Sequence, residues 1–291
     1  MTPPVDILTL VLSFLAGAAV GSFLNVCVAR WPAGESVVAP RSRCPGCGHQ
    51  IRWHENVPIL GWLRLRGRCA SCGGAISVQY PLVELLVGLG WLAAVVAFGP
   101  TFTALRVAVF GTVMAGIALT DAKHYLIPDG FTVFGLLWVL VTAVGGVFVA
   151  EPSPFAGPAD AVLGACVGAG AIAIIGWLGE VALKKEAMGF GDVTLMAVVG
   201  AAVGPWRSLL TVFAGAALAA AVFLLVVVPV VKLRARRAAP AGPVPAAATE
   251  GEDDGDALPQ VPFGVFLAPA ALLTLLWGTE LLDWYLGQFA L

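Results

Sequence analysis

The sequence predicts an all-α integral membrane protein, a bundle of about eight transmembrane helices with one small cysteine-bearing insert. The chain has 291 residues, of which 59% are hydrophobic and only 12% are charged. Its mean hydropathy of +0.92 lies outside the range of soluble domains. Apolar stretches long enough to cross a hydrocarbon core of about 30 Å recur along the chain. We expect helices because open sheet edges are not tolerated in lipid.

The apolar stretches define eight expected spans. They cover residues 7–29, 82–98, 102–119, 131–149, 161–183, 193–203, 209–231 and 263–286. The sixth is too short to cross a bilayer unaided, since a helix rises about 1.5 Å per residue. We expect it to begin within the membrane and to turn at Gly204-Pro205 into the next helix. The first span lacks a basic amino-terminal region, so we expect it to be retained and not cleaved as a signal peptide.

The basic residues predict the orientation of the bundle. If the amino terminus lies outside, all but Arg106 and Arg207 of the 16 Lys and Arg residues fall on the cytoplasmic side. The opposite orientation would invert this ratio. Because cytoplasmic loops carry the excess of Lys and Arg, the sequence predicts an external amino terminus and a cytoplasmic insert.

The chain divides into three expected parts. Residues 1–30 form the first transmembrane helix, residues 31–80 the polar cytoplasmic insert, and residues 81–291 the remaining bundle. Within the bundle, residues at about 234–260 are rich in Ala and Pro and then acidic, which is typical of a disordered loop. The net charge of -2 gives no indication of nucleic acid binding.

Four of the six cysteines form two C-x-x-C pairs in the insert, Cys44 with Cys47 and Cys69 with Cys72. This spacing is typical of a zinc ribbon, in which each pair supplies two thiolates to one tetrahedral ion. Disulfides are the alternative, but a cytoplasmic insert keeps its thiols reduced. The sequence therefore predicts a structural Zn²⁺ site held by four cysteines, with no open position for catalysis.

Two groups of carboxylates lie at the expected cytoplasmic ends of helices. Asp121 and Asp129 flank the end of the third helix, and Asp192 closes the sequence Gly189-Phe190-Gly191-Asp192 after the fifth. Two carboxylates brought together from different helices share a proton, as in aspartic proteases. One then removes a proton from water while the other polarises a peptide carbonyl. Gly189 and Gly191 would let backbone and substrate approach Asp192 closely.

Structural roles for these carboxylates remain open at this point. Asp192 is well placed to cap the short helix that follows it, and Asp121 or Asp129 could pair with Lys123. Glu84 and Glu180 lie inside or near helices and could bind a basic peptide or a cation. Acidic residues beside membrane helices are costly, which favours a functional role.

The chain resembles the type IV prepilin peptidases, bifunctional membrane enzymes of the GxGD class of aspartyl proteases. Besides the cysteine pairs and the carboxylate motifs, the likeness is carried by residues 21–30, 43–47, 55–58, 67–69, 80–84 and 262–264. It covers nearly the whole length of the chain. One departure is Thr194, since family members commonly carry Lys two residues after the second aspartate.

The resemblance implies a catalytic pair, Asp121 and Asp192, that cleaves a short basic leader from prepilins or pseudopilins at the cytoplasmic face of the bacterial inner membrane. It also implies that the new amino terminus is N-methylated with S-adenosylmethionine, and that the cysteine insert is needed for this step. No nucleotide-binding fingerprint marks the site of the methyl donor.

Other functions are compatible with parts of the sequence. A membrane aspartyl protease that only cleaves is the nearest, although the complete cysteine set argues against it. A proton- or cation-coupled transporter would also place paired aspartates beside a broken helix. A zinc-dependent scaffold without catalysis would need neither aspartate.

Overall fold

The computed structural model describes residues 5–184, 188–230 and 262–288, and within them the protein is almost entirely helical. The bundle contains α1 (Ile7–Arg30), α3 (Gln79–Phe98), α4 (Phe102–His124), α5 (Asp129–Val149), α6 (Pro158–Leu183), α7 (Phe190–Val203), α8 (Pro205–Val222) and α10 (Gly264–Gly287). A π-helical stretch, Phe223–Val227, continues α8. The described residues contain no strand, only two isolated bridges. The prediction of an all-α bundle is confirmed.

Seven helices are long and apolar enough to cross a membrane, which makes the chain a multi-pass membrane protein. The eighth, α7, has 14 residues and is the shorter apolar helix expected after Asp192. The predicted count of eight crossings is therefore not confirmed. The expected loop at residues 234–260 lies outside the described residues.

Two helix pairs pack closely through glycine. In α1, an added Cβ at Gly17 or Gly21 would meet α3 at 2.7 and 2.8 Å. In α6, a Cβ at Gly164 would meet the carbonyl oxygen of Gly200 in α7, and the reverse contact is equally close. Small residues let backbones approach where no hydrophobic effect separates helix from lipid. These contacts fix α3 against α1 and α7 against α6.

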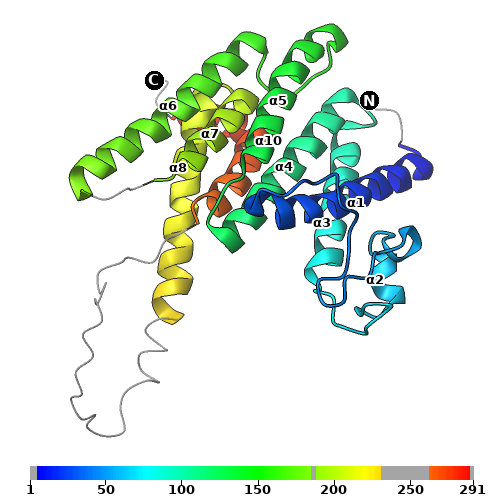
Figure 1. Cartoon of the computed structure of the whole chain (residues 1–291). Helices are drawn as coiled ribbons and strands as arrows, with labels where there is room; N and C mark the ends of the chain where they lie inside the picture. Colours follow the sequence, from blue (N-terminus) through cyan, green and yellow to red (C-terminus); the bar gives the residue numbers. More distant parts are fainter. Residues whose placement is uncertain (1–4, 185–187, 231–261, 289–291) are drawn as a thin grey trace, which may run out of the picture.

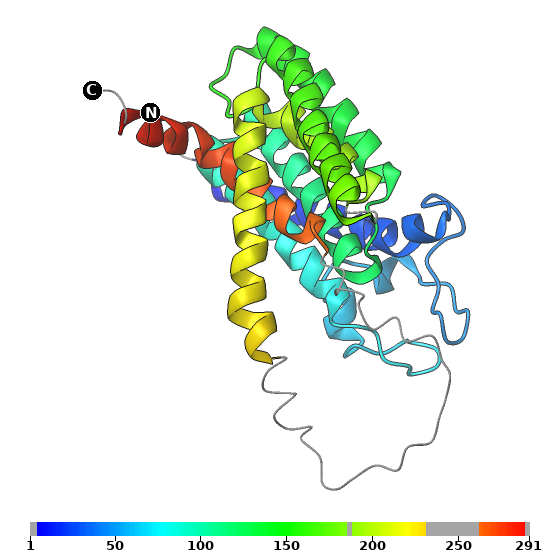
Figure 2. The same ribbon diagram turned by 90° about the vertical axis from the view of Figure 1, so that its left-hand side faces the viewer.

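The helix α4 lies at the centre of the bundle. It contacts α1, α3, α5 and α10 and is the most buried of the candidate spans. Its buried side chains include Phe110, Met114 and Ile117, each at most 1% exposed. In Figures 1 and 2 the other helices are arranged around it, with α6, α7 and α8 on one side and α1 and α3 on the other. Residues near the ends of α4 therefore have fixed surroundings.

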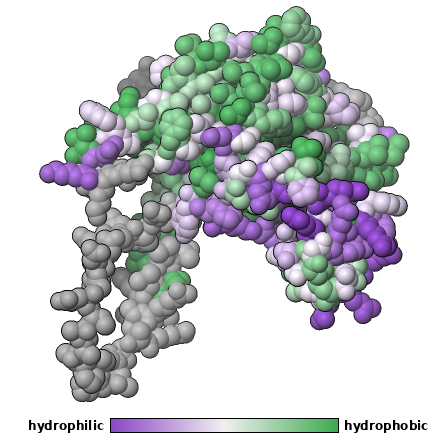
Figure 3. Space-filling model, in the orientation of Figure 1, coloured by the Kyte–Doolittle hydropathy of each residue, from purple (hydrophilic) through white to green (hydrophobic). Residues whose placement is uncertain are grey.

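The insert lies beyond one end of α1 and α3 and returns the chain between them (Figure 1). It contains the short helix α2 (Leu60–Arg64) and two 3-10 turns, Trp31–Ala33 and Trp53–Glu55. In Figure 3 this part of the molecule is the strongly hydrophilic region, beside a predominantly hydrophobic bundle. The polar character expected for residues 31–80 therefore appears on one end of the molecule.

Arg106 and Arg207, the two basic residues that were not predicted to be cytoplasmic, lie together at the end of the bundle opposite the insert. Arg106 donates to Ser153, and Arg207 donates to the carbonyl of Pro154, so both bind the segment between α5 and α6. The Arg106 guanidinium also lies 4.1 Å from the centre of the Phe155 ring. The separation of these two arginines from the insert agrees with the charge pattern from which the orientation was predicted.

Candidate functional site

Asp121 lies in the last turn of α4 and is 5% exposed. Its Oδ2 accepts a hydrogen bond of 3.0 Å from the backbone N–H of Val265, in the first turn of α10. The backbone N–H of Gly264 also donates to this carboxyl. The first N–H groups of a helix have no partner within the helix, so the start of α10 is a natural site for a carboxylate. The contact fixes the orientation of the Asp121 side chain.

The contact between Asp121 and the start of α10 is so close that position 264 requires glycine. A Cβ there would lie 2.9 Å from Asp121 Oδ2 and 3.1 Å from Ile127 Cδ1. Gly264 is itself buried. Any larger residue would have to displace the carboxylate, the helix start or Ile127.

Asp192 is the third residue of α7 and is partly buried. The charge of Asp121 acts on the carboxyl group of Asp192, so the two groups lie within electrostatic range of each other. Gly191 faces Ile127, because a Cβ at Gly191 would lie 3.0 Å from Ile127 Cβ. Ile127 also faces Gly264. This one buried side chain therefore packs against the start of α7, which carries Asp192, and the start of α10, which donates to Asp121. The structure thus brings Asp121 and Asp192 together from different helices.

The aspartates neither occupy the N-cap position of the helix that follows them nor pair with Lys123. Gly189 is the N-cap residue of α7 and Pro128 that of α5, so neither Asp192 nor Asp129 is a cap. Among the described residues the only ion pair within 4 Å joins His49 and Glu55, so Lys123 pairs with neither aspartate. Both aspartates nevertheless accept backbone hydrogen bonds at helix starts, Asp121 from Val265 of α10 and Asp192 from Gly189 of α7.

The two remaining predicted supporting residues lie at the edge of the site. Asp129 is exposed and begins α5. Gly189 has no atom within 4 Å of an added Cβ, so packing does not require glycine there. Thr194 directs its hydroxyl to the carbonyl of Gly191, 2.9 Å away, within its own helix. Of the three glycines near the aspartates, Gly191 and Gly264 are the ones held by contacts.

The four cysteines of the insert form one cluster. Their sulfur atoms all lie within 4.8 Å of one another, and Sγ of Cys44 and Cys72, like Sγ of Cys47 and Cys69, are 3.9 Å apart. A disulfide needs about 2.05 Å. Four sulfurs bound at about 2.3 Å to a tetrahedral ion lie about 3.8 Å apart. The cluster therefore could hold a metal ion.

The two cysteine pairs adopt the same backbone turn. In the first, Cys44 N–H donates to His49 and Gly48 N–H donates back to Cys44; in the second, Cys69 and Gly73 make the equivalent bonds. Gly48 and Gly73 have φ of 71° and 69°, in the left-handed region that favours glycine. The repeated geometry is that of two metal-binding knuckles.

The chemistry of the cysteines also favours a metal. Backbone N–H groups of Cys72 and Ser71 lower the pKa of the Cys69 thiol to about 6, whereas at Cys72 the Gly74 N–H is outweighed by hydrogen bonds with the neighbouring thiols, which raise the pKa of Cys72 to about 11. The thiolate is the form that binds metals. His49 instead contacts Glu55 at 3.3 Å, which explains why it is not a fifth candidate ligand.

Comparison with known proteins identifies the family. Residues 15–98 match the bacterial peptidase A24 N-terminal domain, and residues 108–225 match the type IV leader peptidase family. The chain belongs to the type IV leader peptidase family. No solved structure matches it.

Three relatives show the extent of the likeness. The prepilin leader peptidase/N-methyltransferase of Stutzerimonas stutzeri is 34% identical over 96% of this chain and 93% of its own length. The protein of the same name from Pseudomonas aeruginosa is 35% identical over 96% of this chain and 93% of its own length. That of Myxococcus xanthus is 42% identical, but the match spans 72% of this chain and 60% of the relative.

We predict that the purified protein contains one divalent metal ion per chain and that Cys47→Ser removes it, because three ligands hold a thiophilic ion far less tightly than four. Metal content per chain, measured by mass spectrometry of the elements, provides the check. Cys166→Ser is the matched control, since Cys166 lies on α6 outside the cluster. Equal metal content in all three proteins, or none in the wild type, would contradict a cysteine-held ion.

Proposed function

We propose that this protein is a prepilin leader peptidase and N-methyltransferase, an aspartic endopeptidase of the membrane. It removes the basic leader of type IV prepilins or pseudopilins and methylates the amino terminus that cleavage exposes. The observation that supports cleavage most directly is that the carboxyl groups of Asp121 and Asp192, on α4 and α7, lie within electrostatic range of each other on either side of Ile127. The relatives named above carry both activities in their names.

The arrangement of the two aspartates suits hydrolysis by activated water. Two adjacent carboxylates share one proton, so one accepts a proton from water while the protonated partner polarises the scissile carbonyl. The α10 donors hold Oδ2 of Asp121 in place. Peptide hydrolysis then needs neither a metal nor a covalent intermediate. Gly264 and Ile127 act as positioning residues for this pair.

A small cavity between α6 and the start of α7 supports binding of a basic leader. It has a volume of about 270 Å³ and lies between α6 and the first turn of α7. Glu180 is its one charged lining residue, and Phe190 and Val193, which flank Asp192 in the sequence, also line it. A basic side chain of the leader would find the Glu180 carboxylate there.

The metal centre has a structural role in this proposal. The ion is Zn²⁺, and four thiolates leave it no open position for substrate or water. Its two knuckles fold the insert, which has little apolar core of its own. The insert in turn packs on α1 and α3 and serves the methyl transfer, for which S-adenosylmethionine supplies the methyl group.

In this proposal the protein lies in the bacterial inner membrane with its amino terminus outside. The insert, Asp121 and Asp192 then share the cytoplasmic end of the bundle, and Arg106 and Arg207 lie at the outer end. The resemblance to the type IV prepilin peptidases implies a cytoplasmic leader. Substrate and aspartates then meet on the same side of the membrane.

We predict that Asp121→Asn and Asp192→Asn each slow leader removal by about a thousandfold or more, because general acid–base catalysis contributes about 10² to 10⁴ per group. Mass spectrometry of a prepilin incubated with the purified protein in lipid measures the leader loss. Asp160→Asn is the matched control, since Asp160 lies in the first turn of α6 at the other end of the bundle. Variants that cleave as fast as the wild type would refute the two-aspartate mechanism.

We predict that Gly264→Ala slows cleavage at least about tenfold without lowering the melting temperature by more than a few degrees. The added Cβ displaces the Asp121 carboxylate from a geometry on which the rate depends steeply. The comparison variant is Gly111→Ala on α4, where a Cβ would meet Leu272 of α10 at an ordinary 3.8 Å. If Gly264→Ala cleaves at the wild-type rate, the α10 contact does not position Asp121.

We predict that a cysteine introduced at Ser42 of a variant with Cys27 and Cys166 replaced reacts with a membrane-impermeant thiol reagent, above the labelling of the parent variant, only after the inner membrane is opened. A cysteine introduced at Ser153, in the segment between α5 and α6, should react in intact spheroplasts. The expectation follows from the excess of basic residues at the insert end. The reversed labelling pattern would refute the external amino terminus.

A further inference from the structure

The end of α1 meets the start of α5 through one aromatic residue, Trp31. This residue directly follows Arg30, the last residue of α1, and begins the first 3-10 turn of the insert. Its side chain is half-buried and packs on the hydrophobic core of the bundle. Trp31 belongs neither to the aspartate pair nor to the cysteine cluster, so its burial at this junction calls for a separate explanation.

Trp31 packs closely on the first turn of α5. Its ring lies edge-on to the ring of Phe131, with ring centres 4.4 Å apart. A Cβ added at Gly130 would lie 2.6 Å from Cε2 of Trp31 and 2.7 Å from its Cδ2. The indole therefore fits against α5 only because residue 130 has no side chain. As at the other close helix contacts of the bundle, glycine allows the approach.

Phe131 extends this contact to α4. The Phe131 side chain is 3% exposed, and its ring fills the space beside Gly116, where an added Cβ would overlap it. Leu24 of α1 approaches the same glycine, since that Cβ would lie 2.8 Å from Leu24 Cδ1. Gly116 precedes Asp121 by five residues in the same helix. The end of α1 thus packs on the part of α4 that leads to the first aspartate.

The contact also bears on the turn between α4 and α5. Gly130 is the second residue of α5, and the buried residues Ile127 and Pro128 directly precede that helix. Ile127 faces both Gly191 at the start of α7 and Gly264 at the start of α10. Because Pro128 has a fixed φ, the position of the first turn of α5 determines where Ile127 lies. Two routes, through α4 and through Ile127, therefore lead to the aspartates.

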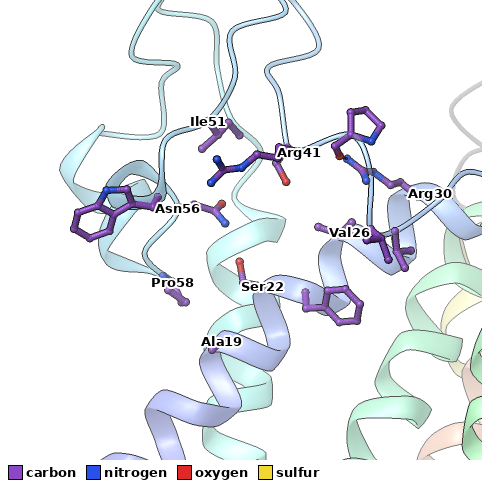
Figure 4. A pocket seen from close by; sticks show the side chains of 14 residues that line it. Ala19, Ser22, Val26, Arg30, Arg41, Ile51, Asn56 and Pro58 are labelled. Carbon is purple, nitrogen blue, oxygen red and sulfur yellow. Dashed lines mark hydrogen bonds between the residues drawn. The ribbon is translucent and has the colours of Figure 1, made fainter.

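The insert leaves one flank of α1 unsupported. A cavity of about 420 Å³ lies between α1 and the insert. Figure 4 shows Ser22 and Val26 of α1 on one side of it and Asn56 of the insert on the other. The position of α1 is consequently set by its packing on α3 and α4 and, at its end, by the contact of Trp31 with α5.

We infer from these contacts that Trp31 is a positioning residue of the peptidase. Its indole holds the start of α5 against α4 and thereby fixes Ile127, against which the starts of α7 and α10 pack. The inference rests on the proposed cleavage function and adds to it a residue from outside the helices that carry or bind the aspartates. Trp31 acts through Ile127 and the two helix starts, and not on the substrate.

Steady-state cleavage of a prepilin by the full-length protein in lipid nanodiscs tests the inference. Trp31→Ala should lower kcat about tenfold or more and change KM less than about twofold, because small displacements of reacting groups slow the chemical step while leader binding is retained. Trp31→Phe keeps a ring against Phe131 and should restore kcat to within about threefold of the wild type. If Trp31→Ala does not fold, Gly130→Ala perturbs the same contact from α5 and should lower kcat likewise.

Trp91→Ala is the matched control. Trp91 on α3 approaches a glycine just as closely, since a Cβ at Gly17 in the middle of α1 would lie 2.7 Å from it. Each alanine variant removes one tryptophan from a contact with glycine, so both should have a lower melting temperature than the wild type. Only Trp31→Ala should have a lower kcat.

Hydrogen exchange measured by mass spectrometry gives a second readout, which does not require turnover. The backbone N–H of Val265 is bonded to Asp121 and reports on the junction between α10 and α4. Trp31→Ala should lose protection from exchange in the peptides that contain Ile127 and Val265, because local opening follows the loss of buried contacts. Trp91→Ala should leave both peptides as protected as in the wild type.

Each outcome decides one claim. Loss of kcat and of protection in Trp31→Ala, with Trp91→Ala normal in both, supports the positioning role. Equal kcat in Trp31→Ala and the wild type, or equal losses in the two alanine variants, overturns it. A rise in KM alone would place Trp31 at the leader and would also overturn it. If the wild-type protein cleaves no prepilin, the proposed function fails, and the exchange measurement decides whether Trp31 fixes the aspartates.

Discussion

The hydrogen bond from the start of α10 to Asp121 is the contact on which the peptidase site depends. It joins residues 144 positions apart and fixes a carboxyl group that would otherwise be free to rotate at a helix end. The same helix start packs on Ile127, and Ile127 packs on Gly191 at the start of α7. The position of Asp192 relative to Asp121 is thus set by a short chain of contacts between three helices, with glycine at the closest points.

Two glycine-mediated helix pairs fix the positions of neighbouring helices. Contact between α6 and α7 fixes the helix that carries Asp192, and contact between α1 and α3 fixes the helix that carries Glu84. Both pairs rely on backbone approach, because lipid provides no hydrophobic force to hold helices together. Close packing at these glycines therefore holds the helices that carry Glu84 and Asp192 in position.

The sequence predicted those features that depend on neighbouring residues. Apolar length predicted the spans, and C-x-x-C spacing predicted the metal cluster, since both follow from local geometry. The role of Gly264 could not be predicted, because the partner of its backbone N–H lies in α4. The start of α7 at Phe190 placed Asp192 inside the helix and not at its cap. Likewise the cavity under the insert depends on how residues 31–80 fold back on α1, which spacing alone does not define.

Pro262 and Phe263 directly precede the first turn of α10. These residues are the only covalent link between the chain at 231–261 and the helix whose first N–H groups hold Asp121. Val265, the donor to Asp121, is only two residues beyond Phe263. A shift of the first turn of α10 would therefore turn the Asp121 carboxylate without touching Asp192.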